Sequence, residues 1–86
     1  MSETRLVYFA WVRERIGKAD ETVEIPADVV TAGDLLGWLA AKGDGYAEAL
    51  AVPSAIRVAI NQEHVRHDEP IAGAREIALF PPMTGG

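Results

Sequence analysis

Residues 31–42 read TAGDLLGWLAAK and form the one long helix that the sequence predicts. Apolar side chains recur there at the i, i+3, i+4, i+7 and i+8 positions of a helix, at Ala32, Leu35, Leu36, Leu39 and Ala40. Thr31 and Asp34 have the spacing of a capping box, in which each side chain accepts a hydrogen bond from the other residue's backbone N–H. Because one amphipathic helix buries only one side, the fold depends on the strands around it.

Two glycines, Gly33 and Gly37, lie inside this predicted helix. Glycine is about 1 kcal/mol less favourable than alanine in a helix interior, so its presence needs a reason. We expect Gly37 to mark a place where the helix packs closely on a sheet.

Five segments around the helix have the apolar pattern of strands: residues 6–11, 21–25, 56–60, 64–66 and 76–80. The first of them is apolar on both alternating faces, which predicts a central strand or one covered on both sides. Asn61-Gln62 separates the third segment from the fourth and suits a tight turn, because asparagine tolerates a positive φ.

The order of these elements is strand, strand, helix, strand, short strand, strand. Residues 13–17 are interpreted as a polar turn, with a single helical turn stopped by Gly17 as the alternative. Residues 44–54 are interpreted as irregular chain with Tyr46 and Leu50 in the core. The sequence therefore predicts no second helix, which a ferredoxin-like fold would need. Two hairpins flanking one helix, with the first and last strands parallel in the middle of a mixed sheet, predict an α+β protein of the β-grasp, or ubiquitin-like, class.

Composition and charge narrow the class of function. The chain has 86 residues, enough for one domain, and 49% of them are hydrophobic, which argues against disorder. Its net charge of −5 disfavours nucleic acid and favours a basic protein partner. The absence of cysteine excludes disulfides and thiolate chemistry on this chain. No apolar run is long enough to span a membrane and no signal peptide is evident, so we expect a cytoplasmic protein.

The titratable residues do not form a recognisable catalytic motif. The chain has no glycine-rich phosphate loop and no hydrolase motif. His64 and His67 are interpreted as solvated hairpin residues rather than metal ligands, so no metal site is expected. The adjacent carboxylates Asp20-Glu21 and Asp68-Glu69 are interpreted as solvated turns.

The last seven residues, Phe-Pro-Pro-Met-Thr-Gly-Gly, are the remaining distinctive feature. Pro81 and Pro82 favour a stiff, extended conformation that would carry the end about 19 Å from the domain. Gly85 and Gly86 have no Cβ, so they can pass through a narrow channel, and the Gly86 carboxylate would be the reactive group at the tip. We therefore expect a β-grasp domain over residues 1–80 and an extended tail over 81–86. A frayed, inert terminus is the alternative.

This tail, together with the order of elements, resembles the ubiquitin-like sulfur carriers, and most of all the small subunits of molybdopterin synthases. The resemblance covers the whole chain. Residues 9–14, with Gly17, resemble that family's first strand and turn, and residues 59–62 resemble its central hairpin. The motif Phe-Pro-Pro-x-Thr-Gly-Gly is its most specific signature, whereas thiamine-pathway carriers share the Gly-Gly but usually lack the two prolines.

The resemblance implies a mechanism and a set of partners. An adenylating enzyme of the ubiquitin-activating type would use ATP and magnesium on the Gly86 carboxylate, and sulfur from a persulfide donor would then leave a thiocarboxylate. The tail would enter the large subunit of molybdopterin synthase and donate sulfur to cyclic pyranopterin monophosphate, forming the dithiolene. Two small and two large subunits would assemble. This chain would not be catalytic alone and would bind no permanent cofactor.

A docking face beside the tail is also predicted. If Ile77 and Leu79 face the helix, then Phe80 points outward, and Phe9 points the same way by strand alternation. Two exposed aromatic side chains beside a functional tail indicate a protein interface, although burial in a second, smaller core is the alternative. The resemblance adds His64, where an apolar residue is commoner, and the tail residues Pro81, Pro82, Met83 and Thr84 as partner contacts.

Three other functions remain open on the sequence. The chain could carry sulfur for thiamine synthesis or for tRNA thiolation. It could be a ubiquitin-like modifier that is conjugated to lysines through the same activated tail. It could also be a plain interaction module whose tail is inert.

Overall fold

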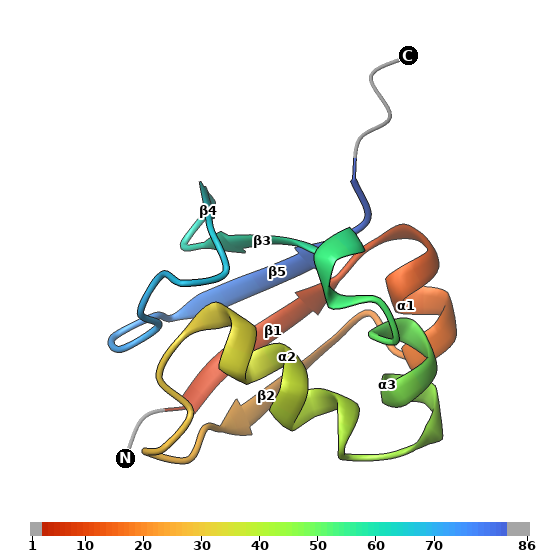
Figure 1. Cartoon of the computed structure of the whole chain (residues 1–86), viewed down its shortest axis with the longest axis horizontal. Coiled ribbons are helices and arrows are strands. Elements are labelled where there is room, and N and C mark those ends of the chain that lie inside the picture. Colours follow the sequence, from red (N-terminus) through yellow and green to blue (C-terminus); the bar gives the residue numbers. More distant parts are fainter. Residues whose placement is uncertain (1–2, 83–86) are drawn as a thin grey trace.

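A computed structural model describes residues 3–82 and contains one five-stranded mixed sheet, in the order β2-β1-β5-β3-β4 (Figure 1). The strands are β1 (Glu3–Tyr8), β2 (Asp20–Glu24), β3 (Arg57–Ile60), β4 (Glu63–Val65) and β5 (Glu76–Phe80). β1 and β5 are parallel neighbours, while β2 and β4 are antiparallel to their partners and form the edges. The prediction of a β-grasp fold with the first and last strands parallel at the centre is confirmed.

The main helix also forms as predicted, as α2 (Ala32–Ala40). Thr31 is its N-cap, and the Thr31 hydroxyl accepts a hydrogen bond from the Asp34 backbone N–H at 3.1 Å. The Asp34 carboxylate accepts in return from the Thr31 N–H at 3.2 Å, which completes the capping box. The backbone N–H groups of Thr31 and Val30 both donate to the Asp34 carboxylate and hold its pKa below the usual value, because they favour the charged form.

The prediction of a single helix is wrong, because residues 10–16 form α1 (Ala10–Ile16). The first strand ends at Tyr8 rather than at Trp11, and the apolar run continues into the helix. Gly17, with a φ of 94°, ends α1 in the left-handed conformation that glycine adopts most readily. A run of six apolar residues looks like one strand, and its division between a strand and a helix depends on tertiary packing.

The segment expected to be irregular contains α3 (Asp44–Ala49) and a 3₁₀ turn (Pro53–Ala55). Helix α3 packs against α1 at Gly45, where a Cβ would lie 2.8 Å from the Arg15 carbonyl oxygen. A glycine at this position lowers the helix propensity of a six-residue segment, so the sequence gives little sign of a helix. The tight contact with α1 explains why the glycine is there.

The expected close packing at Gly37 is also wrong. Gly37 is exposed, and a Cβ added to it would meet no atom within 4 Å. The close contact lies instead at Gly33, where a Cβ would be 3.3 Å from the His67 carbonyl oxygen. That oxygen accepts a hydrogen bond from the Gly33 backbone N–H at 2.8 Å. This bond holds the start of α2 against the loop that follows β4.

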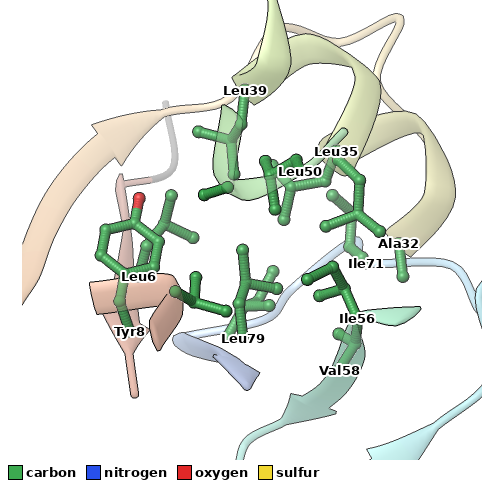
Figure 2. Close-up of a cluster of buried hydrophobic side chains, with 14 of the residues drawn as sticks. Leu6, Tyr8, Ala32, Leu35, Leu39, Leu50, Ile56, Val58, Ile71 and Leu79 are labelled. Atoms are coloured by element: carbon green, nitrogen blue, oxygen red, sulfur yellow. The ribbon is translucent and has the colours of Figure 1, made fainter. Parts of the chain in front are cut away.

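The core lies between the sheet and the helices. Figure 2 shows side chains of β1, β3 and β5 meeting those of α2, with Leu50 and Ile71 closing the cluster. The largest fully buried residues include Leu6, Tyr8, Leu35, Leu36, Leu39, Leu50, Ile56, Ile77 and Leu79. Leu50 therefore lies in the core as predicted, while Tyr46 packs against it from a half-buried position. In the described part of the chain, no helix has the length and apolarity needed to cross a membrane.

Candidate docking site at the end of the last strand

The end of β5 lies beside an apolar hollow. The hollow has a volume of about 380 Å³ and is lined by Phe9, Ala10, Phe80, Pro81 and Pro82. Phe80 is the last residue of β5, and the other four residues directly follow β1 or β5, two parallel neighbours whose carboxyl ends lie at the same end of the sheet. Figure 1 shows that the chain leaves β5 at this end of the sheet, beside the start of α1. The segment after β1 and the Phe80-Pro81-Pro82 segment, which are far apart in the sequence, are therefore brought together.

Strand alternation sets which side chains face the hollow. Ile77 and Leu79 are fully buried under the helices, whereas Ala78 and Phe80 point to the other face and are half-buried. Phe9 is 48% exposed, which makes it one of the few large exposed apolar side chains of the described residues. Phe9 is therefore not buried in a second core, and the predicted outward direction of Phe9 and Phe80 is confirmed.

His64 lies on the same face as Phe80, at the other side of β3. It sits in the edge strand β4, opposite Ala59 of β3, and its side chain is exposed. Its ring packs edge-on against the Phe80 ring, with the centroids 5.2 Å apart. The three predicted contact residues therefore lie close together, because Phe9 and Phe80 line the same hollow and His64 packs on Phe80.

The predicted tail residues fall into two groups. Pro81 and Pro82 follow β5 directly, are half-buried and line the hollow. Met83, Thr84, Gly85 and Gly86 lie outside the described residues. The roles predicted for those four residues remain predictions.

A polar cluster that the sequence did not reveal lies on the helical side of the sheet. Both Tyr8 and Tyr46 donate their hydroxyls to the same Glu21 carboxylate oxygen, at 2.6 and 2.7 Å. The Lys18 ammonium lies 3.4 Å from the other oxygen. The interpretation of Glu21 as part of a solvated turn is therefore wrong, because its side chain is only 15% exposed. This cluster ties β1, β2 and α3 together.

The pKa values of Glu21 and Tyr8 are both shifted away from neutral pH. Desolvation by itself would raise the pKa of Glu21, but the hydrogen bonds from Tyr8 and Tyr46 and the charge of Lys18 outweigh it and lower that pKa. Burial, and then the hydrogen bond to Glu21, raise the pKa of Tyr8 well above its usual range. Glu21 therefore stays ionised and Tyr8 stays neutral at neutral pH, and the hydrogen bonds of the cluster stabilise the fold.

The two histidines are held in separate places. His67 Nε2 lies 2.8 Å from the carbonyl oxygen of Ile56, while the His64 ring packs on Phe80. Among residues 3–82, no three histidine or acidic side chains are grouped closely enough to hold a metal ion.

Comparisons with known proteins place this architecture in a family. Residues 6–86 match the model of the ThiS family. The molybdopterin synthase sulfur carrier subunit of Escherichia coli is 38% identical over 95% of this chain and 98% of its own length. The subunit of the same name from Haemophilus influenzae is 38% identical over 94% of this chain and 96% of its own length.

The fold of this chain also matches that of a solved structure. The small archaeal modifier protein 1 of Haloferax volcanii is 27% identical, with a TM-score of 0.71 over 96% of this chain and all of that chain. The sequence match and the shared β-grasp architecture agree along nearly the whole length. The chain belongs to the ThiS family.

Proposed function

We propose that this chain is the sulfur carrier subunit of a molybdopterin synthase. The observation that carries the proposal is that Phe80, Pro81 and Pro82, the first three residues of the motif Phe-Pro-Pro-Met-Thr-Gly-Gly, lie at the end of the central strand β5 and line an apolar hollow. Two curated relatives with 38% identity carry that name and match nearly the whole chain. A reactive group that follows β5 would be held next to a surface suited to a protein partner.

The proposed chemistry takes place on the Gly86 carboxylate. A carboxylate oxygen of Gly86 attacks the α-phosphorus of magnesium-bound ATP in an adenylating enzyme, and pyrophosphate leaves. The terminal sulfur of a persulfide donor then attacks the acyl carbon and displaces AMP. A thiol cleaves the resulting S–S bond and forms a disulfide with the donor, which leaves a thiocarboxylate on Gly86. Adenylation is needed because AMP is a far better leaving group than oxide.

The thiocarboxylate then serves the synthase. Its sulfur bonds to a carbon of cyclic pyranopterin monophosphate in place of an oxygen substituent, and water then cleaves the acyl–sulfur bond and restores the Gly86 carboxylate. Two loaded carriers are needed for each dithiolene, because that group contains two sulfurs. An assembly of two small and two large subunits would meet this requirement. The chain has no cysteine, which is consistent with sulfur carried on a carboxyl group. The large subunit would supply the catalytic pocket, so this chain is not catalytic alone.

The proposed docking surface for the large subunit consists of Phe9, His64, Phe80, Pro81 and Pro82. Phe9 and Phe80 offer apolar area, and the two prolines restrict the chain as it leaves the sheet. A preorganised contact of this kind loses less entropy on binding than a flexible one. Met83 and Thr84, which follow the prolines in sequence, are proposed to continue the contact into the partner. We place the protein in the cytoplasm, where the adenylating enzyme would meet it.

A second function has one observation in its favour. The solved structure that resembles this chain belongs to a protein named as a small archaeal modifier. A modifier would use the same activated Gly86 carboxylate but would transfer it to a lysine amine. Isopeptide linkage of Gly86 to cellular proteins would support that function, whereas a free thiocarboxylate bound to a large synthase subunit supports sulfur carriage.

A reconstituted synthase tests the proposal. Purified chain, adenylating enzyme, ATP, sulfur donor and large subunit should convert cyclic pyranopterin monophosphate to the dithiolene product. Deletion of Gly86 should abolish the conversion and leave the circular dichroism spectrum unchanged. A deletion variant that still supports full dithiolene formation would refute the proposed role of Gly86.

A further inference from the structure

The open face of the sheet carries its charges in two separate halves. The exposed residues of β1 and β2 alternate with buried ones and project from this face. Glu3 lies directly opposite Glu24, and both are exposed. Arg5, a cation of this half, is already paired, because its guanidinium lies 2.6 Å from an Asp20 oxygen and 3.7 Å from a Glu76 oxygen. The half formed by β1 and β2 is therefore acidic.

The half formed by β3 and β4 carries the opposite charge. Arg57 begins β3, is exposed and lies directly opposite Phe80, the last residue of β5. Residues opposite each other on neighbouring strands project to the same face, with their Cβ atoms about 4.5–5.5 Å apart. The β3–β4 register pairs Val58 with Val65, and one further step along it would place Arg66 beside Arg57. These two arginines, which we call the basic margin, border the aromatic part of the docking surface.

Arg57 has no ionic partner in the described part of the chain. Among residues 3–82, no carboxylate oxygen lies within 4.0 Å of its guanidinium, whereas Arg5 on the acidic half has two. Arg66 has the exposed Asp68 at 4.0 Å, and an exposed pair of this kind contributes little to stability. Like charges side by side on neighbouring strands are destabilising, so the basic margin does not help the fold. Local choices that work against stability tend to mark functional positions.

We propose that Arg57 is a docking residue that binds a carboxylate on the large synthase subunit, with Arg66 adding to the attraction. A guanidinium group can hold a carboxylate through two parallel hydrogen bonds, which fixes direction as well as distance. This inference rests on the proposed function, because it extends the docking surface for the large subunit by one charged contact.

The position of Arg57 decides what this contact does. Arg57 lies beside the residue at which β5 ends, so a carboxylate held there fixes the partner next to the point where the chain leaves the sheet. The net charge of −5 favours a basic partner for the chain as a whole, but the basic margin favours acidic groups at this one place. A partner with both kinds of group in the matching order docks in one orientation, because the reverse orientation brings like charges together.

Arg57→Glu is the informative substitution, with Arg75→Glu as its matched control. Both residues are exposed arginines, and both substitutions change the net charge by the same amount. Arg75 comes directly before β5, at the opposite end of that strand from Phe80. Arg57→Glu should melt at the wild-type temperature or slightly above it, because repulsion from Arg66 is removed. A lower melting temperature for both Arg57→Glu and Arg57→Gln would show a structural role and overturn the inference.

The first measurement is titration with the large subunit of molybdopterin synthase in about 0.1 M and about 1 M salt, which screen charges beyond about 10 and 3 Å. At the lower salt, Arg57→Glu should bind at least about tenfold more weakly than the wild type, and Arg57→Gln about threefold to tenfold more weakly. Both losses should shrink at the higher salt. Arg75→Glu should bind within about twofold of the wild type. Equal losses for Arg57→Glu and Arg75→Glu would show an effect of net charge alone and overturn the inference.

The second measurement identifies the group that faces position 57. Arg57→Lys keeps the charge and introduces an amine that a carbodiimide can join to a carboxylate in contact with it. The complex should give a crosslink between position 57 and an aspartate or glutamate of the large subunit, whereas Arg75→Lys should give none at position 75. Crosslinks of position 57 only to a second copy of this chain would overturn the inference, because the acidic half of that copy would then be the occupant.

The wild-type chain separates this inference from the proposed function. If the wild type does not bind the large subunit, the proposed function fails, and this inference fails with it. If the wild type binds and Arg57→Glu binds equally well at the lower salt, the inference alone is overturned.

Discussion

The His64 ring packs edge-on against the Phe80 ring, with the ring centroids 5.2 Å apart. This contact crosses β3 and joins the edge strand β4 to the last residue of β5. The Phe80 side chain is half-buried and lies on the face of the sheet opposite to that of the fully buried Leu79. The aromatic side chain nearest in sequence to the tail is thus supported by His64 and remains partly exposed.

Phe80→Ala should weaken binding of the large synthase subunit more than it weakens the fold. Truncation of an aromatic residue near the centre of an interface typically costs about 2 kcal/mol or more of binding free energy. Leu79→Ala is the matched control, because Leu79 is fully buried on the other face of the same strand. That change should instead lower the free energy of unfolding by about 2–5 kcal/mol. Thermal melting and partner titration on both variants distinguish these effects, and a larger stability loss for Phe80→Ala than for Leu79→Ala would contradict the assignment.

Glu21 should make stability depend on pH. Its pKa in the folded chain lies below the ordinary value of 4.5, so the stabilisation is fully present above that value and is lost as the pH falls through the folded-state pKa. Glu21→Gln should lower the free energy of unfolding by about 1–3 kcal/mol near neutral pH. The difference between wild type and variant should shrink as the pH falls through the folded-state pKa of Glu21.

Denaturant titrations at several pH values test this expectation. Glu24→Gln is the control, because Glu24 is an exposed residue of the same strand and its replacement should change stability by less than about 0.5 kcal/mol. A Glu21→Gln penalty that stays constant from neutral to acidic pH would show that the carboxylate charge does not contribute.

Gly37→Ala should stabilise the protein. An added methyl group would meet no atom within 4 Å, and alanine is about 1 kcal/mol more favourable than glycine inside a helix. Gly33→Ala should gain less in unfolding free energy, because its methyl group would lie 3.3 Å from the His67 carbonyl oxygen. Melting temperatures of the two variants provide the comparison, and an equal gain for both would mean that the loop at His67 yields easily.

Gly85→Val should leave the fold intact and impair sulfur loading or transfer. Residue 85 comes after the last strand in the sequence, and valine restricts the backbone and widens the chain where it would thread a partner's channel. A displacement of the acyl carbon by about 1 Å can slow the reaction roughly a hundredfold. Pyrophosphate release measures adenylation, and pre-loaded carrier measures transfer. Gly85→Ala should be intermediate, whereas wild-type rates for Gly85→Val in both assays would mean that the channel is wide.

The parts of the fold that the sequence predicts are those set by local patterns. The alternation of residues 76–80 places β5 at its observed bounds, and the Thr31–Asp34 spacing identifies the start of α2. The Asn61-Gln62 turn has the positive φ angles expected for it. In each case the sequence pattern that predicts the element lies within the element itself.

The parts that the sequence does not predict depend on distant contacts. Helix α3 is short and contains Gly45, and its contact with the Arg15 carbonyl is visible only once α1 is in place. The Glu21 cluster needs two tyrosines that lie 13 and 25 residues away. The docking site is predicted only in part. Alternation predicts the directions of Phe9 and Phe80, whereas the left-handed backbone of Ala10, with a φ of +54°, cannot be predicted from an alanine.

The central claim is that sulfur is carried on the Gly86 carboxylate, and intact-mass spectrometry tests it most directly. The chain is incubated with the adenylating enzyme, ATP, magnesium and a persulfide donor, then weighed intact beside the Gly86 deletion variant. We predict that the full chain becomes heavier by the difference between one sulfur and one oxygen atom, that fragmentation places the change on Gly86, and that the deletion variant does not change. A full chain that keeps its original mass under conditions in which the enzyme releases pyrophosphate would contradict the claim.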